Sequence, residues 1–369
     1  MANLESAMRG EELAAMRLRV LFRRYGYARF DMSKFEEYEL YSRNKSFLAS
    51  DSIITFTGAG GRLMALRPDV TLSIVKAAPG GGPPRRLYYS ENVYRPRHAG
   101  REVSERMQVG LECIGEIGAY EMGEVLMLAS RSLGEIGGRN CLCLSHMGFL
   151  TGLLRGAGIE GQPGEQLLSR VGDRSESEIR RLCGEYGLDG GFTEKFASLA
   201  GLYGPIAERI YDLRALSVNG ETEAAIGEIE QVCRIARRLG APGDINIDFS
   251  IVNDMNYYSG IIFQGFVEGI PAAVLSGGRY DKLLRRFGKF SGAIGFAVYA
   301  DMLEGSRGGE DRPDADVLVL YGEGDDPLEI AAAVRDIADG GESVCAMSEE
   351  GDLKYGRLVR LSERRGAGI

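Results

Sequence analysis

The residues best suited to chemistry begin with a strand-like run at 107–113, M-Q-V-G-L-E-C. Strict alternation puts its apolar side chains on one face and Gln108, Gly110 and Glu112 on the other. A solvent-facing surface would explain the amide and the carboxylate, but it gives no reason for the glycine between them. We therefore predict that this face is a pocket wall, with the missing side chain leaving room for a ligand.

A second stretch, 248–284, adds aromatic hydroxyl groups. Tyr257 and Tyr258 follow a predicted strand, and a Ser-Gly-Gly-Arg-Tyr run ends at Tyr280. The glycines are expected to form a turn that opens into a helix and lets the backbone approach a ligand closely. This combination is typical of the floor of a small-molecule pocket.

The run 67–71, Arg-Pro-Asp-Val-Thr, predicts the start of a helix, because proline and then small polar residues favour the first turn. Two interpretations of Asp69 and Thr71 stay open. Both residues could simply cap the helix, or both could point into a cleft from the helix start.

Histidine and cysteine chemistry has few candidates. The two histidines, His98 and His146, are interpreted as a polar loop residue and a residue at a strand end. The six cysteines are scattered, and the C-x-C pair of Cys141 and Cys143 has no second pair or histidine cluster to complete a zinc set. We expect reduced core thiols, with no metal and no cofactor.

Composition narrows the class of protein. The chain has 369 residues, 44% hydrophobic and 26% charged, which is typical of a soluble protein of two or three domains. A net charge of −9 argues mildly against a protein whose main task is to grip nucleic acid, although 95–106 is locally rich in arginine. No apolar run approaches the roughly 18 residues of a membrane span, and residues 1–10 lack a signal-peptide core. We expect a cytoplasmic protein.

The order of predicted elements indicates an α+β fold. Helical periodicity fills the middle of the chain between two strand-rich blocks, which favours a helical insertion in an antiparallel domain over alternating parallel units. The last residues carry a short strand–helix–strand fragment that ends at Met347. The predicted boundaries are a first core part (1–147), a helical insertion (148–243), a second core part (244–304), a linker (305–312) and a truncated C-terminal α/β unit (313–369).

Five motifs in order resemble those of histidyl-tRNA synthetases and of their paralogue, the regulatory subunit of ATP phosphoribosyltransferase. They are L-R-P-D-V-T, N-V-Y-R with a following A-G-R, M-Q-V-G-L-E-C-I-G, N-Y-Y-S-G with S-G-G-R-Y-D-K-L-L, and G-F-A-V. The resemblance covers residues 10–304. It implies the class II aminoacyl-tRNA synthetase catalytic fold, an antiparallel sheet flanked by helices, with a helical insertion in the corresponding place and normally dimeric.

By position in these motifs, the resemblance implies that eight residues bind histidine: Asp69, Thr71, Arg95, Gln108, Glu112, Tyr257, Tyr258 and Tyr280. Asp69, one methylene shorter than the usual glutamate, would hold the ammonium group with Thr71 and Gln108. Glu112 and Tyr258 would read the imidazole, since a carboxylate that accepts from a ring N–H selects histidine over other amino acids.

The sequence departs from the synthetase pattern at positions where synthetases contact the phosphates of ATP. Asn253 stands where synthetases have an arginine before the tyrosine pair, and Met302 stands where an arginine clamps ATP. Arg95, which matches an arginine that touches the carboxylate or α-phosphate, is followed by Pro96 instead of an acidic residue. Fixed positive charge stabilises the transition state of adenylate formation, and neutral side chains cannot replace it.

The resemblance therefore favours the non-catalytic paralogue. Its implied partners are the short catalytic subunit of ATP phosphoribosyltransferase and histidine as effector, with a homodimer inside a hetero-oligomer, no membrane and no tRNA. The tail after the linker is too short for a complete anticodon-binding domain. Two alternatives remain: a divergent histidyl-tRNA synthetase, and a stand-alone amino-acid sensor or modified synthetase paralogue for another amino acid.

Overall fold

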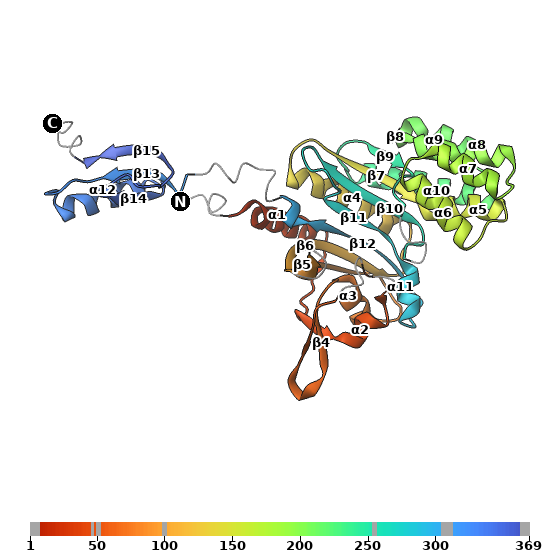
Figure 1. The fold of residues 1–369 in the computed structure, drawn as a ribbon, viewed down its shortest axis with the longest axis horizontal. Coiled ribbons are helices and arrows are strands. Elements are labelled where there is room, and N and C mark those ends of the chain that lie inside the picture. Colours follow the sequence, from red (N-terminus) through yellow and green to blue (C-terminus); the bar gives the residue numbers. More distant parts are fainter. Residues whose placement is uncertain are drawn as a thin grey trace. The chain divides into compact units, whose positions relative to one another are not determined.

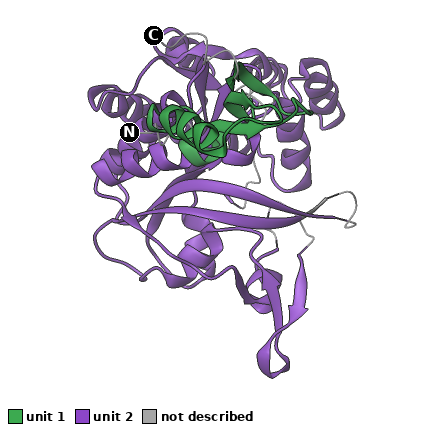
Figure 2. Cartoon of the chain, turned by 90° about the vertical axis from the view of Figure 1, so that its left-hand side faces the viewer, with its two compact units in different colours: residues 1–13, 304–369 green, residues 14–303 purple. Residues whose placement is uncertain are grey.

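The computed structural model describes residues 8–45, 48, 53–97, 102–252, 257–303 and 313–361. The chain divides into two compact units, a main unit of residues 14–303 and a small unit of residues 1–13 and 304–369 (Figure 2). The main unit groups the predicted core parts and the predicted insertion together, so the boundary between core and insertion stays a prediction.

Nine strands of the main unit form one sheet in the order β1-β5-β6-β12-β11-β10-β7-β9-β8 (Figure 1). Neighbouring strands are antiparallel except for the pairs β1–β5 and β7–β9, which are parallel. The predicted antiparallel sheet is therefore correct at most of its pairings. The strands are β1 (Ala28–Arg29), β5 (Arg85–Arg97), β6 (Glu102–Gly115), β7 (Asn140–His146), β8 (Tyr203–Pro205), β9 (Ile245–Asp248), β10 (Ile261–Val267), β11 (Leu275–Arg279) and β12 (Gly292–Tyr299).

One face of this sheet carries the core. Leu111 of β6 is fully buried, and Phe296 of β12 stacks edge-on against Phe22 of helix α1 (Gly10–Arg24), with ring centroids 5.8 Å apart. Helix α4 (Ala119–Ile136) packs on the same sheet, where Gly265 leaves space that Leu133 fills. Because side chains alternate along each strand, the polar residues of β6 must face the other side of the sheet.

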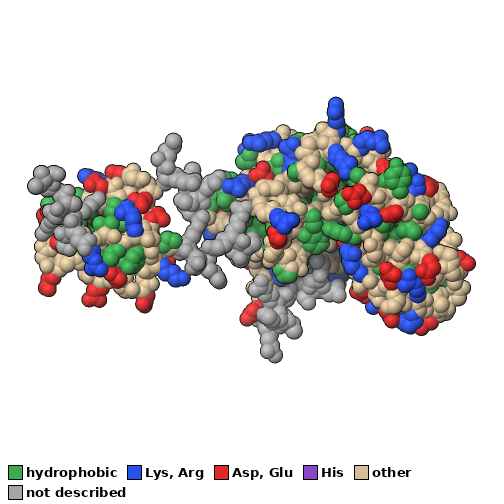
Figure 3. Space-filling model, turned by 90° about the horizontal axis from the view of Figure 1, so that it is seen from above, with side chains coloured by type: hydrophobic (Ala, Val, Ile, Leu, Met, Phe, Trp, Pro, Cys, Tyr) green, Lys and Arg blue, Asp and Glu red, His purple; other side chains and the backbone are tan. Residues whose placement is uncertain are grey.

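Helices fill most of residues 147–238, the helical segment. Helix α10 approaches α4 closely, since a β-carbon at Gly123 would lie 2.4 Å from a side-chain carbon of Ile235. The prediction of an all-helical region misses only strand β8 and a short 3₁₀ turn, η5 (Leu199–Gly201). Acidic and basic side chains are interspersed over this segment on the face shown in Figure 3. Its helices are α5 (Met147–Gly156), α6 (Gln162–Gly172), α7 (Glu176–Glu185), α8 (Gly190–Ser198), α9 (Ile206–Ala215) and α10 (Gly220–Arg238).

A second, three-stranded sheet projects from the main unit (Figure 1). Its β3–β4 pair is the predicted hairpin around a glycine cluster, and Gly60 and Gly61 both adopt a φ of 76° there. Short helices complete the unit. The elements are β2 (Phe35–Glu37), α2 (Tyr38–Ser42), β3 (Thr55–Thr57), η3 (Ala59–Gly61), β4 (Leu63–Leu66), α3 (Thr71–Ala77), α11 (Asp281–Arg286) and η6 (Ala300–Leu303). In the chain, α2 follows β2, α3 follows β4, α11 precedes β12 and η6 follows β12.

In residues 313–361, the described C-terminal part of the small unit, helix α12 accompanies a three-stranded parallel sheet in the order β14-β13-β15. Strands β13 (Ala315–Leu320) and β14 (Val344–Met347) and helix α12 (Pro327–Asp339) match the predicted fragment. The prediction that the fragment ends at Met347 is wrong, because β15 (Tyr355–Arg360) pairs in parallel with β13. Strand β15 is partly exposed and rich in arginine, so it lacks an alternating apolar signal. Across the described residues, no helix is long and apolar enough to cross a membrane.

Candidate functional site

A cavity of about 250 Å³ lies on the sheet face opposite helices α1 and α4. All eight residues predicted to bind a ligand line it, although they come from five separate parts of the chain. The full lining is Leu48, Asp69, Thr71, Tyr89, Arg95, Gln108, Glu112, Tyr257, Tyr258, Ser276, Gly277, Tyr280, Gly295, Phe296, Ala297 and Tyr299.

Glu112 is the central acceptor of the cavity. Its side chain is buried, Thr71 Oγ1 donates to Oε1 at 3.0 Å, and the Tyr280 hydroxyl donates to Oε2 at 2.5 Å. Burial raises the pKa of Glu112 to about 8, with a further contribution from the nearby Asp69 carboxylate, while the two hydroxyl donors oppose this rise. The group is therefore largely protonated at neutral pH.

Asp69 fulfils both interpretations left open by its sequence. Its Oδ1 accepts from the Leu72 backbone N–H at 2.9 Å, which caps the first turn of α3, and the same side chain lines the cavity. Burial raises the pKa of Asp69, and the Leu72 N–H and the Arg95 charge work against that rise. Capping and a place in the cleft are thus compatible roles, because the helix begins at the cavity wall.

Three tyrosines form an aromatic wall. The rings of Tyr257 and Tyr258 meet edge-on with centroids 4.5 Å apart, and Tyr257 and Tyr280 lie 6.0 Å apart. Burial raises the pKa of all three phenols well above the usual value. Each therefore stays a neutral phenol, able to donate a hydrogen bond to a ligand or to Glu112.

Glycines shape the cavity, but not always as predicted. A β-carbon at Gly295 would lie 1.7 Å from Glu112 Oε2, so this glycine of β12 makes room for the carboxylate on the neighbouring strand. The prediction that Gly110 leaves room for a ligand is wrong. A β-carbon there would lie 2.5 Å from the Tyr89 hydroxyl, because the Tyr89 side chain from β5 occupies that space.

The predicted glycine turn at Gly277 and Gly278 is also wrong, since both lie inside strand β11. A β-carbon at Gly277 would lie 2.3 Å from the Gly295 carbonyl, and one at Gly278 would lie 2.7 Å from the Tyr258 ring. These glycines permit close contact between strands and with a cavity tyrosine, and they are not needed to reverse the chain.

Sequence reasoning missed the polar side chains of Tyr89, Ser276 and Tyr299. Tyr89 pairs with Gly110 across β5–β6, and Tyr299 pairs with Gln108 across β6–β12. Both pairings join strands whose register the sequence alone does not give. Ser276 stood in the glycine motif and could have been found by the alternation of β11.

Positive charge is scarce among the described lining residues of the cavity. Arg95 is the one arginine or lysine among the described lining residues, and its Nε donates to the Pro68 carbonyl at 3.2 Å. Met302 is half-buried against the core and does not line the cavity. Asn253 and His98 lie outside the described residues.

His146 is a strand-end residue, as predicted. It is the last residue of β7, and its Nδ1 accepts from the Phe149 N–H at 3.3 Å, which caps helix α5. Its ring lies outside the cavity, so it does not contribute directly to the candidate site.

Comparison with known proteins begins with families and sequences. The family model described as histidyl-tRNA synthetase matches residues 3–303. The ATP phosphoribosyltransferase regulatory subunit of Symbiobacterium thermophilum is 30% identical over 349 residues, which cover 89% of this chain and 86% of that protein. The regulatory subunit of Ruminiclostridium cellulolyticum is 28% identical over 331 residues, 86% of this chain and 79% of that protein.

Solved structures share the fold. A Bacillus halodurans protein described as an ATP phosphoribosyltransferase regulatory subunit/histidyl-tRNA synthetase has a TM-score of 0.77 at 23% identity, covering 95% of this chain and 93% of that one. A chain of the Thermotoga maritima ATP phosphoribosyltransferase (HisG:HisZ) complex has a TM-score of 0.62 at 16% identity, covering 79% and 97%. These likenesses confirm the predicted α+β fold of class II synthetase type.

Proposed function

The chain belongs to the histidyl-tRNA synthetase family, in the branch of ATP phosphoribosyltransferase regulatory subunits, and from this premise we propose that its cavity binds free histidine as a feedback effector. As a member of this branch the protein is a regulatory subunit in histidine biosynthesis, and the transfer reaction belongs to a separate catalytic subunit. What the cavity binds, and how binding is communicated, are the proposed parts.

The charge balance of the cavity is the observation that carries the proposal. Two carboxyl groups, Asp69 and Glu112, are buried in one small cavity, with only Arg95 as a cation among its described lining residues. Burial raises the pKa of both carboxyl groups, so a ligand that supplies a positive charge allows them to ionise and is favoured by them. Histidine brings an ammonium group and an imidazole, and its single carboxylate matches the single arginine.

The arrangement supports one orientation of histidine. The ammonium would lie between Asp69, Thr71 and Gln108, and the imidazole would donate to Glu112 and meet Tyr258. The carboxylate would then point to Arg95. Every polar group of the ligand obtains a partner of opposite character in this orientation, as a buried site requires.

Family membership also supports a proposal about assembly. We propose that the protein binds the short catalytic subunit of ATP phosphoribosyltransferase, as a homodimer within a hetero-oligomer, in the cytoplasm. The Thermotoga maritima complex supports a partnership of this kind by its likeness in fold. Inhibition would then be a coupling free energy between histidine binding and the state of the catalytic subunit, and that coupling must be reciprocal for binding.

Calorimetric titration with histidine and with other amino acids tests the effector. We expect saturable binding of histidine that survives in the presence of the catalytic subunit and is absent for amino acids without an imidazole. Flat histidine titrations under both conditions would exclude the proposed site.

A second assay separates regulation from synthetase chemistry. Histidine-dependent exchange between ATP and pyrophosphate is expected to be absent, because Met302 stands in place of the arginine that clamps ATP in synthetases. Co-purification with the catalytic subunit and recovery of transferase activity are expected instead. Clear exchange activity would favour the divergent synthetase over the regulatory subunit.

A further inference from the structure

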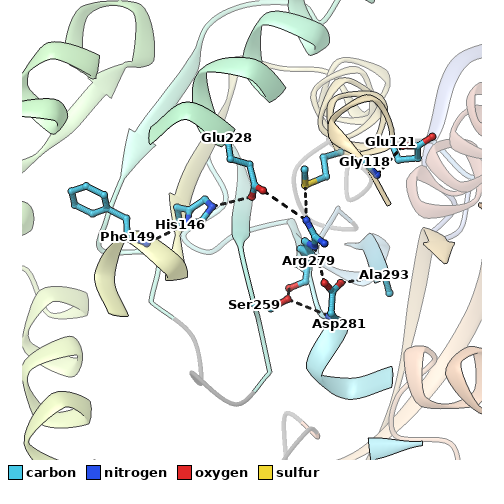
Figure 4. A network of polar contacts seen from close by, with 10 residues as sticks. Gly118, Glu121, His146, Phe149, Glu228, Ser259, Arg279, Asp281 and Ala293 are labelled. Atoms are coloured by element: carbon cyan, nitrogen blue, oxygen red, sulfur yellow. Dashed lines mark hydrogen bonds and ion pairs between the residues drawn. The ribbon is translucent and has the colours of Figure 1, made fainter. Parts of the chain in front are cut away.

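A polar network outside the cavity joins helix α10 to the strand that ends at the cavity (Figure 4). Its centre is Glu228 of α10, whose Oε1 lies 2.9 Å from His146 Nε2 and whose Oε2 lies 3.7 Å from Arg279 Nη1. Because His146 Nδ1 accepts from the Phe149 N–H, Nε2 carries the proton and donates to Glu228. The carboxylate thus bridges the β7–α5 junction and strand β11.

Arg279 and Asp281 are the two neighbours of Tyr280 in the chain, and they are paired with each other. Arg279 Nε lies 2.9 Å from Asp281 Oδ2, and Asp281 Oδ1 accepts from the Ala293 N–H at 2.9 Å. The Tyr280 N–H donates to the Ala293 carbonyl at 2.8 Å. The backbone on both sides of Tyr280 is therefore tied to β12 through the same network.

The other cavity tyrosine, Tyr258, is connected through the next residue. The Ser259 N–H donates to the Arg279 carbonyl at 2.9 Å, and the Asp281 N–H donates to Ser259 Oγ at 3.3 Å. Both tyrosines that approach the imidazole position in the proposed orientation thus have a chain neighbour in this network.

The ion pair of Glu228 and Arg279 is partly shielded from solvent. The side chains of Glu228 and Arg279 keep 29% and 24% of their accessible surface, and that of His146 keeps 7%. The hydrogen bond from His146 and, to a smaller extent, the charge of Arg279 lower the pKa of Glu228, against the effect of burial. Glu228 therefore stays a carboxylate, and its attraction to Arg279 is only partly screened by solvent.

We propose that Glu228 is a positioning residue for the effector site: from the helical segment, through Arg279 and Asp281, it holds Tyr280 against Glu112 and so sets the affinity for histidine. This inference rests on the proposed function, since the affinity concerns the same cavity. It makes α10 a second control point, because a partner or mutation that moves this helix changes Tyr280 without entering the cavity. By reciprocity, histidine binding stabilises the present position of α10.

Calorimetric titration of Glu228→Gln with histidine, in the full chain, tests the link. Gln keeps the size and can still accept from His146, but it loses the charge that faces Arg279. We expect a dissociation constant about three- to tenfold higher. The matched control is Glu230→Gln, which also removes a negative charge from α10. Glu230 pairs with Arg214 at 3.0 Å and not with Arg279. The dissociation constant of this control should stay within about twofold of wild type.

A Tyr280→Phe background separates positioning from a general structural effect. If Glu228 acts through the Tyr280 hydroxyl, then Glu228→Gln should change the affinity by less than about twofold in that background. An equal loss of affinity in both backgrounds, or no loss in the wild-type background, overturns the inference.

Hydrogen exchange without histidine keeps the test independent of ligand binding. The amides of Tyr280 and Ala293 should exchange about fivefold faster in Glu228→Gln than in wild type or Glu230→Gln. Without the charge of Glu228, Arg279 and Asp281 are held less firmly, and the hydrogen bonds of these two amides open more often. If wild type does not bind histidine, the proposed function fails while this measurement still decides the positioning role. Unchanged exchange at both amides overturns it.

Discussion

Acidic and basic groups differ in number at the cavity. Glu112 receives two hydroxyl donors and lies near a second buried carboxyl group, Asp69. Arg95 is the one arginine or lysine among the described lining residues, and Met302 packs against the core without lining the cavity. Recognition of an amino acid needs acceptors for its ammonium group, whereas activation by ATP needs fixed positive charge. The described lining is therefore better equipped to bind an amino acid than to activate one.

The largest effect on histidine binding is expected at Glu112. Glu112→Ala removes the central acceptor and leaves the hydroxyls of Thr71 and Tyr280 without their partner. We expect histidine affinity to fall by at least about 100-fold, because a buried polar ligand group is then unpaired. Assembly with the catalytic subunit should be intact while inhibition by histidine is lost.

Titration calorimetry measures the affinity, and inhibition of the assembled enzyme measures the response. Glu116→Ala is a matched control, since this glutamate follows β6 directly and is exposed. Unchanged inhibition by histidine in Glu112→Ala would remove Glu112 from the effector site.

The second effect concerns stability and pH. The folded-state pKa of Glu112 is about 8 and the ordinary value is 4.5, so the folded protein holds a proton that the unfolded chain releases. The stability associated with that proton is fully present below the ordinary pKa and is lost as pH rises through 8. Between pH 6 and pH 8 the loss is about 2 kcal/mol of unfolding free energy.

Glu112→Gln removes this titration and should flatten the pH dependence by that amount. Urea unfolding of both proteins at pH 6 and pH 8, without histidine, gives the difference, and Glu116→Gln should behave as wild type. Equal pH dependence in wild type and Glu112→Gln would mean that the buried carboxyl does not carry the proton.

The third effect tests the remaining cation. Arg95→Ala should weaken histidine binding about tenfold, because a charge-assisted pair with the ligand carboxylate is lost. Histamine, which lacks that carboxylate, should bind wild type and variant within about twofold of each other. Calorimetry with both ligands checks this, and an equal loss for histamine would show that Arg95 acts on the cavity as a whole.

The sequence predicted which polar residues lie together better than it predicted the shape of the space around them. All eight predicted residues line one cavity, because motif positions carry residue identity directly. The place of Tyr89 could not be predicted in the same way. Its position against Gly110 depends on the register of β5 on β6, which is a long-range property of the sheet.

The errors in the fold have related causes. Gly277 and Gly278 read as a turn because glycine pairs usually signal one, whereas here the constraint is crowding from Gly295 and the Tyr258 ring. Strand β15 was missed because its side chains are partly exposed on a small sheet and do not alternate. Prediction from the local sequence pattern fails at positions where residues distant in the chain determine which side chain fits.

The smallest effect on histidine binding is expected at Met302, and it tests whether this position acts independently of the cavity. Met302→Ala trims a half-buried side chain that packs against the core without lining the cavity, so the cost should fall on stability and not on binding. We expect a loss of about 1–2 kcal/mol in unfolding free energy, with histidine affinity within about twofold of wild type. Met302→Leu keeps most of the volume and should change neither quantity. An affinity loss beyond about fivefold in Met302→Ala would mean that this position shapes the cavity from outside its lining.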